Sequence, residues 1–292
     1  MNTYNELKYK VFNSGSKVNL FIGINVIVFL MLSIISLVSL LFFKQGGIDL
    51  FTYEYLGVPA NLHSLLYRFW TPFTYMFVHE GIWHILFNML WLFWMGKIFE
   101  GFQNPKKLTF LYILGGISGA AFYIICYNLI PAFKDSAPTS IAVGSSAAVS
   151  AIVIATATLL PNYSIQLLLF GSVKLKWLAL VFIIIDVISL AGSNAGGHLS
   201  HLGGALFGFF YIKSLQNGKD WSKVFENVFK PRKKLKIVSK NFDVESPSNN
   251  DQLPNQETVD AILDKISQSG YNSLSKKEKN TLFRASRGNE EE

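Results

Sequence analysis

Unbroken apolar runs dominate residues 18–216 of the chain. The apolar residues do not recur every three or four positions, as on the buried face of a soluble helix, but follow one another along whole stretches. A helix of about 20 apolar residues crosses a hydrocarbon core of about 30 Å. We therefore predict an all-α, polytopic membrane bundle of six helices. The expected spans are residues 18–43, 82–99, 108–131, 146–160, 175–192 and 199–216.

The remaining sequence is polar and divides into three further segments. These are an N-terminal tail at 1–17, a basic juxtamembrane segment and linker at 217–254, and a small helical hairpin at 255–287. In the last segment apolar residues return at helical spacing, Gly270 interrupts them, and Ser275 with Glu278 has the spacing of a capping box. The pattern predicts two short helices that meet near Gly270.

The loop at 44–80 is more apolar than an ordinary connection. Its large apolar residues are interrupted by Arg68 and Pro72. They are Leu62, Leu65, Leu66, Phe69, Trp70 and Phe73. We expect this loop to lie along the outer membrane interface.

Composition supports a membrane protein, since 50% of the residues are hydrophobic and 15% are charged. Lysine and arginine concentrate in the N-terminal tail, in the 97–107 and 161–176 connections and after the last span, so both termini are predicted to be cytoplasmic. The basic residues after the last span can bind anionic lipid headgroups. The formal net charge of +7 therefore requires no nucleic acid partner. The single cysteine, Cys126, lies in an apolar run and cannot form an internal disulfide.

Polar side chains inside the spans are few, and each is costly enough in a membrane to suggest a function. They are His84, Asn88, Ser145, Ser146, Ser150, Asp186, His198, Ser200 and His201. The second, fourth and sixth spans all run from outside to inside, so their first turns share one layer near the outer leaflet. This layer brings together His84, Asn88, the serines at 145–146 and His201.

These residue types are the components of an acyl-transfer site. A serine hydroxyl needs a neighbouring base, which a neutral histidine supplies. Donors must then stabilise the oxyanion of the tetrahedral intermediate, and free N–H groups at the head of a helix, together with Asn88 and His84, can do so. Any one of these residues alone is better explained by capping or packing, but their joint occurrence favours a site.

Small residues surround the candidate serine and histidine. Gly144 precedes the serines, and Gly204 and Gly208 form a G-x-x-x-G face after His201. Such faces let helices approach closely, so we assign these glycines a structural supporting role.

Three segments resemble the motifs of the rhomboid family of intramembrane serine proteases. Gly144-Ser145-Ser146-Ala147 is similar to its G-x-S-G motif, and the segment from His201 to Gly208 to its H-x-x-G-x-x-x-G helix. His84-Ile85-Leu86-Phe87-Asn88 is similar to its H-x-x-x-N span. The resemblance covers about 60–216. The polar segment that follows would be a cytoplasmic helical extension of a bacterial-type member.

The resemblance implies a function and a set of roles. Ser146 would be the nucleophile and His201 the general base, while His84, Asn88 and the Ser146 backbone amide would form the oxyanion hole. It implies a Ser–His dyad without an acidic member, no cofactor or metal, transmembrane protein substrates and membrane lipids as partners. The expected location is the bacterial inner membrane.

The sequence departs from the family pattern at three positions. Ala147 follows the nucleophile where glycine is usual, and Thr71 follows Trp70 where the family often has arginine. Ser150 stands where some members place an aromatic ring against the histidine.

The same residues allow other interpretations. A zinc protease motif fails because His79 and His84 are five residues apart, not four. A catalytically inactive rhomboid-like scaffold remains the alternative, and so does Ser145 as nucleophile, because only the family's register favours Ser146. We expect Asp186 to hydrogen-bond within the bundle and His198 to lie in the outer loop, in solvent.

Overall fold

The computed structural model describes residues 2–43, 47–167, 171–223 and 254–287. The chain divides into two compact units, Met1–Pro231 and Arg232–Glu292. Most of the predicted juxtamembrane segment and linker, residues 224–253, lies outside the described residues.

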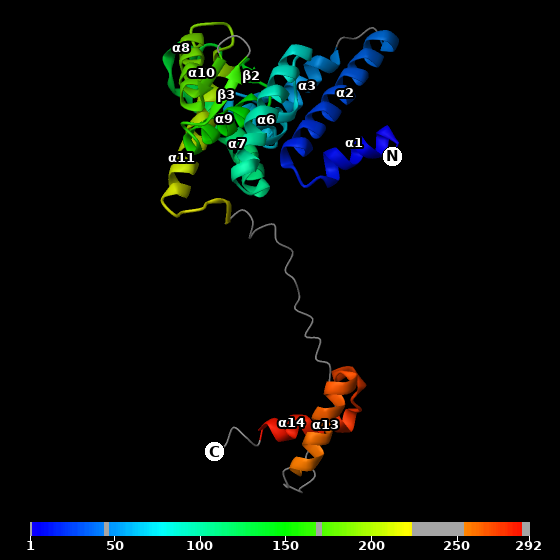
Figure 1. Ribbon diagram of the computed structural model, residues 1–292. Helices are drawn as coiled ribbons and strands as arrows, with labels where there is room; N and C mark the ends of the chain where they lie inside the picture. The colour runs from blue at the N-terminus through cyan, green and yellow to red at the C-terminus, as the bar shows by residue number, and fades with distance from the viewer. Residues whose placement is uncertain (1, 44–46, 168–170, 224–253, 288–292) are drawn as a thin grey trace. The chain divides into compact units, whose positions relative to one another are not determined.

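Six helices of the first unit coincide with the predicted spans (Figure 1). They are α2 (Lys17–Phe43), α6 (Ile82–Phe102), α7 (Pro105–Leu129), α9 (Ser146–Leu159), α10 (Leu175–Ser189) and α11 (Ala195–Gln216). Helices α2, α6 and α7 are long and apolar enough to cross a membrane, and α9 is a shorter apolar helix. The predicted all-α fold class is confirmed as a mostly helical fold with three candidate membrane spans among the described residues, whereas the count of six spans stays a prediction.

Shorter elements fill the connections. They are α1 (Thr3–Lys8), the π-helical turn η1 (Tyr9–Asn13), α3 (Gly47–Leu56), α4 (Leu62–Tyr67), α5 (Thr71–Thr74), η2 (Tyr75–Phe77) and α8 (Pro131–Lys134). Two antiparallel strand pairs were not predicted. In one, β1 (Val58–Pro59) pairs with β2 (Ile141–Ala142), and in the other β3 (Ser164–Leu167) pairs with β4 (Gly171–Lys174).

Helix α9 is the centre of the first unit. Every residue from Ala147 to Ala157 is buried. Added Cβ atoms on Gly204 and Gly208 of α11 would clash with the backbone of α9, and an added Cβ on Gly115 of α7 would meet Ala151. The predicted small-residue faces therefore let α7 and α11 close on the helix that carries the candidate serine.

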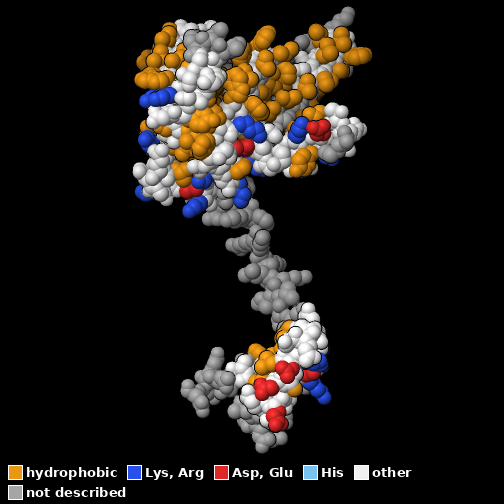
Figure 2. Space-filling model, viewed as in Figure 1, with side chains coloured by type: hydrophobic (Ala, Val, Ile, Leu, Met, Phe, Trp, Pro, Cys, Tyr) orange, Lys and Arg blue, Asp and Glu red, His pale blue; other side chains and the backbone are white. Residues whose placement is uncertain are grey.

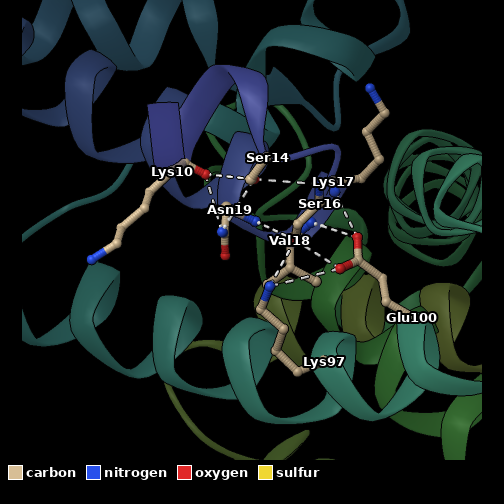
Figure 3. Close-up of polar contacts among 8 residues, drawn as sticks. All are labelled: Lys10, Ser14, Ser16, Lys17, Val18, Asn19, Lys97 and Glu100. Atoms are coloured by element: carbon tan, nitrogen blue, oxygen red, sulfur yellow. Dashed lines mark hydrogen bonds and ion pairs between the residues drawn. The ribbon is translucent and has the colours of Figure 1, made fainter. Parts of the chain in front are cut away.

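A half-buried carboxylate ties the start of α2 to the end of α6 (Figure 3). Glu100 of α6 accepts hydrogen bonds from the backbone N–H groups of Lys17 and Val18, at 2.6 and 3.0 Å, and from the Ser16 hydroxyl at 2.7 Å. The Lys97 ammonium donates to the same hydroxyl at 2.8 Å. The first N–H groups of a helix have no acceptor within it, so Glu100 caps α2 from another helix.

The loop before α6 is held by Arg68. Its guanidinium donates to the Glu54 backbone carbonyl at 2.7 Å and to the Glu54 carboxylate at 2.6 Å. The Trp70 indole N–H donates to the Tyr55 carbonyl at 2.8 Å. This arginine, two residues before Trp70, anchors the loop although Thr71 follows the tryptophan.

Hydrophobic side chains spread over the face of the first unit seen in Figure 2. Exposed hydrophobic residues of this unit also occur in the loop before α6, where Leu66 and Phe69 are each 76% exposed. An apolar exterior of this kind suits contact with lipid, and the predicted interfacial position of the loop stays a prediction.

The second unit contains α13 (Gln256–Ser269), the 3-10 turn η3 (Tyr271–Ser273) and α14 (Lys276–Arg287). Gly270 separates the two helices with a φ of 76°, a left-handed conformation that favours glycine. The predicted capping box is present, because Ser275 N–H donates to the Glu278 carboxylate at 2.7 Å and Glu278 N–H to the Ser275 hydroxyl at 3.4 Å.

Candidate functional site

A cavity of about 260 Å³ opens among α6, α9, α10 and α11. Its lining includes all four side chains that the sequence predicts for the site: Ser146, His201, His84 and Asn88. They come from the first two turns of α6, the first turn of α9 and the second turn of α11, so the predicted layer of polar residues exists. The structure brings the candidate nucleophile, base and oxyanion donors together.

Ser146 is the first residue of α9 and is half-buried at the cavity wall. The first N–H groups of a helix lack an intrahelical acceptor, so its amide is free to act as a donor to a ligand. The preceding Ser145 is fully buried and its hydroxyl lies 3.0 Å from His79 Nε2. The two adjacent serines therefore have different surroundings, and only Ser146 lines the cavity.

His79 lies in the loop before α6. Its burial, and then the neighbouring His84 ring, lower its pKa to about 3. The ring is therefore neutral at physiological pH, and it pairs with Ser145 as an uncharged hydrogen-bonding group.

Gly144 brings the chain to the serine in a conformation that side chains disfavour. Its φ is 125°, and its N–H donates to the Tyr75 carbonyl at 2.9 Å. A Cβ at this position would lie 2.8 Å from His84 Nε2 and 3.4 Å from Ser146 Oγ. Glycine thus allows the chain between β2 and α9 to pass close to the imidazole and the serine hydroxyl.

Asn88 and His84 lie one turn apart on α6. The Asn88 side-chain amide donates to the His84 backbone carbonyl at 2.8 Å. This bond uses one of its two N–H hydrogens and fixes the orientation of the amide, which leaves the second for a ligand in the cavity.

Helix α10 supports His201 in a way that the sequence reasoning missed. His201 Nδ1 lies 2.8 Å from Asp186 Oδ1, and the Phe182 ring stacks on the imidazole with a centroid distance of 6.2 Å. Asp186 does hydrogen-bond within the bundle, as expected, but its partner is the candidate base. Phe182 supplies the aromatic ring that Ser150 does not. The signal was the spacing of four residues between Phe182 and Asp186, which places them on one face of a helix.

The expectation for His198 is wrong. Instead of lying in the outer loop, it belongs to α11 and places Nδ1 2.8 Å from Asp186 Oδ1. The reason is a cap. The Asn194 side chain accepts a hydrogen bond from Gly197 N–H at 3.2 Å, and α11 begins at Ala195, about a turn earlier than predicted.

Asp186, His198 and His201 also have the composition of a metal site. One ligand atom from each lies within 4.8 Å of the others. Two imidazoles and a carboxylate suit zinc. In the structure, however, both imidazoles are at hydrogen-bond distance from the same carboxylate oxygen, and the expectation that no metal is needed stays a prediction.

Comparison with known proteins decides the family. A family model described as a rhomboid domain matches residues 67–217. The chain belongs to the rhomboid family. A second model, of a family of unknown function (DUF6576), matches residues 243–288, which include the C-terminal helices.

Three relatives from Arabidopsis thaliana illustrate the range of the rhomboid family. RHOMBOID-like protein 12, mitochondrial, is 30% identical over 157 residues, which cover 50% of this chain and 44% of that protein. RHOMBOID-like protein 1 is 28% identical over 59% of this chain and 38% of its own length. Inactive RHOMBOID-like protein 8 is 28% identical over 46% of this chain and 36% of its own length. The chain thus spans less than half the length of these relatives, and family membership alone does not establish activity.

Proposed function

We infer that this rhomboid protein is an intramembrane serine endopeptidase that cleaves transmembrane proteins. The observation that carries the inference is the shared cavity, into which Ser146, His201, His84 and Asn88 all project. A catalytically inactive scaffold would need none of these groups to share one cavity.

In the proposed reaction, His201 removes the Ser146 hydroxyl proton while Oγ attacks the carbonyl carbon of a substrate peptide bond. The carbonyl oxygen becomes an oxyanion that accepts hydrogen bonds from the Ser146 amide, the Asn88 amide and His84. Protonated His201 then gives the proton to the leaving nitrogen, and the C–N bond breaks. Water, deprotonated by His201, hydrolyses the acyl-enzyme and restores the Ser146 hydroxyl.

Substrates and membrane position are part of the same proposal. The exposed apolar exterior suits a protein that meets its substrates within the bilayer. We propose cytoplasmic termini, because lysine and arginine concentrate in the N-terminal tail and after α11. The bacterial inner membrane is the proposed location.

A serine-directed fluorophosphonate probe tests the proposal on the full chain in detergent micelles. Wild type should label covalently, and Ser146→Ala and His201→Ala should each reduce labelling and peptide-bond cleavage by at least about 10³-fold. Equal labelling of all three proteins would contradict the assignment of Ser146 and His201 as nucleophile and base.

A further inference from the structure

The polar groups around Asp186 form a connected set. Asp186 Oδ1 lies 2.8 Å from the Nδ1 atoms of both His198 and His201. The Asp186 side chain is 4% exposed, and its second oxygen, Oδ2, is buried without a hydrogen-bond partner. A carboxylate in this position is costly, and the hydrogen bonds of a single oxygen offset only part of the cost.

The tautomer of the base follows from an ionised Asp186. An ionised carboxylate only accepts, so His201 donates from Nδ1. In the neutral ring Nε2 then carries no proton and is the atom able to accept one. That is the form a general base must have when it faces a serine hydroxyl.

Helix α10 also fixes the plane of the ring. Phe182, one turn before Asp186, stacks on the imidazole at an interplanar angle of 30°. One face of α10 thus contacts both an edge and a face of the base, while Ser146 lies across the cavity on α9.

We propose that Asp186 is the positioning residue for His201, so that the site works as a Ser146–His201–Asp186 relay and not as an unsupported dyad. The proposal rests on the proposed function. Asp186 holds the Nδ1–H tautomer and stabilises the imidazolium that forms when Ser146 is deprotonated. It touches neither the substrate nor the transferred proton. His198 donates to the same oxygen and helps to orient the carboxylate. The cavity lining also contains two other titratable groups, His84 and Glu80.

The test compares variants of the full chain for cleavage of a transmembrane peptide and for probe labelling, with EDTA present. Asp186→Asn keeps the shape of the side chain but lets its amide group stabilise the wrong tautomer. In a soluble serine protease the same exchange lowers kcat by about 10⁴-fold. We expect kcat to fall by about 10²-fold or more, with KM within about threefold. Asp186→Glu should recover part of kcat, and Ile188→Ala, an exposed position on the same helix, should behave like wild type.

His198→Asn separates positioning from a purely structural role. It removes the second donor that orients Asp186 but leaves the carboxylate available to His201, so kcat should fall by less than about tenfold, whereas Asp186→Asn should lower it by about 10²-fold or more. If Asp186→Asn does not fold, the variants Asp186→Glu and His198→Asn still test the proposal. The proposal requires that both of them cleave the transmembrane peptide.

Three results would overturn the proposal. Wild-type kcat in a folded Asp186→Asn, with Ser146→Ala and His201→Ala inactive, leaves the protease function intact but removes the role of Asp186. Loss of wild-type activity in EDTA, restored by Zn²⁺, assigns the three side chains to a metal. Failure of wild type itself to label or cleave overturns the protease function and the relay together.

Discussion

The hydroxyl of Ser145 lies 3.0 Å from Nε2 of His79. Both side chains are buried, and His79 belongs to the segment between η2 and α6. This contact gives the first of two adjacent serines a partner and leaves Ser146 as the serine at the cavity wall. The choice between the two serines, which depends in the sequence on the family's register, has a physical basis here.

The first prediction concerns these two serines. Ser145→Ala should keep probe labelling within about tenfold of wild type, because it removes one neutral hydrogen bond worth about 1 kcal/mol. Ser146→Ala should abolish labelling. Labelling that persists in Ser146→Ala and disappears in Ser145→Ala, as measured by in-gel fluorescence, would move the nucleophile by one residue.

The contact between α9 and α11 gives a second prediction. A methyl group on Gly204 would meet the Ala147 backbone carbonyl, which cannot rotate away, so Gly204→Ala should lower the free energy of unfolding by about 1–3 kcal/mol. Because the clash pushes α11 from α9, probe labelling should fall as well. Gly101→Ala is the matched control, since a Cβ at Gly101 meets nothing within 4 Å. It should be neutral or stabilising by up to about 1 kcal/mol. Equal effects in thermal unfolding of the two variants would contradict the close packing.

The third prediction concerns Glu100, which caps α2. Glu100→Ala leaves the N–H groups of Lys17 and Val18 without their acceptor and should cost about 1.5–3 kcal/mol in detergent-solubilised protein. Glu6→Gln provides the comparison, because Glu6 pairs with Lys10 at 2.9 Å on an exposed surface and contributes at most about 1 kcal/mol. The idea fails if both changes shift the thermal midpoint equally.

The C-terminal hairpin should lose stability in acid. Hydrogen bonds from Lys265 and from Ser275 lower the pKa of Glu278 from 4.5 to about 2. A carboxyl whose pKa is lowered on folding stabilises the fold above its unfolded pKa, so the contribution is complete above pH 4.5 and is lost as pH falls towards 2. Hydrogen exchange of peptides from α13 and α14 measures it.

The informative comparison in that experiment is wild type against Glu278→Gln at each pH, because the chemical exchange rate then cancels. Wild type should be better protected at pH 6, and the difference should vanish as pH approaches 2. A difference independent of pH would show that the charge of Glu278 does not matter.

A fifth prediction addresses orientation. With the single native cysteine replaced, as in Cys126→Ser, one new cysteine is introduced at a time by Asn2→Cys, Ser136→Cys or Ser273→Cys. A membrane-impermeant maleimide applied to intact cells should label only the protein with Ser136→Cys, because the 132–145 loop is predicted to be outside. Labelling of the Asn2→Cys protein before permeabilisation would reverse the assigned topology.

The pattern of apolar residues predicted the helices well, because a long apolar run in a membrane must satisfy its backbone hydrogen bonds internally and therefore forms a helix. It also placed Ser146, His201, His84 and Asn88 in one layer, since their depths follow from where each helix begins. It did not predict the pairing of β1 with β2, because two residues per strand carry no pattern.

The contact of Asp186 with His201 could not be predicted from the pattern of apolar and polar residues either. It depends on how α10 is rotated about its axis, and that rotation is poorly specified when nearly every face is apolar. The polar side chain of Asp186 was the one feature of the sequence that indicated which face of α10 packs against the bundle. The place of His198 was misjudged because the cap at Asn194 lengthens α11 beyond its apolar run.

The low burial of helix α10 affects how the protein responds to heat. Among its residues only Leu175 and Asp186 are buried, in contrast to the continuous burial of α9. Segments with few buried contacts open at lower free energy than the molecule as a whole. Heating should therefore detach α10 from the base before the bundle melts, and enzyme turnover should be lost over a temperature range in which the helix content is still intact.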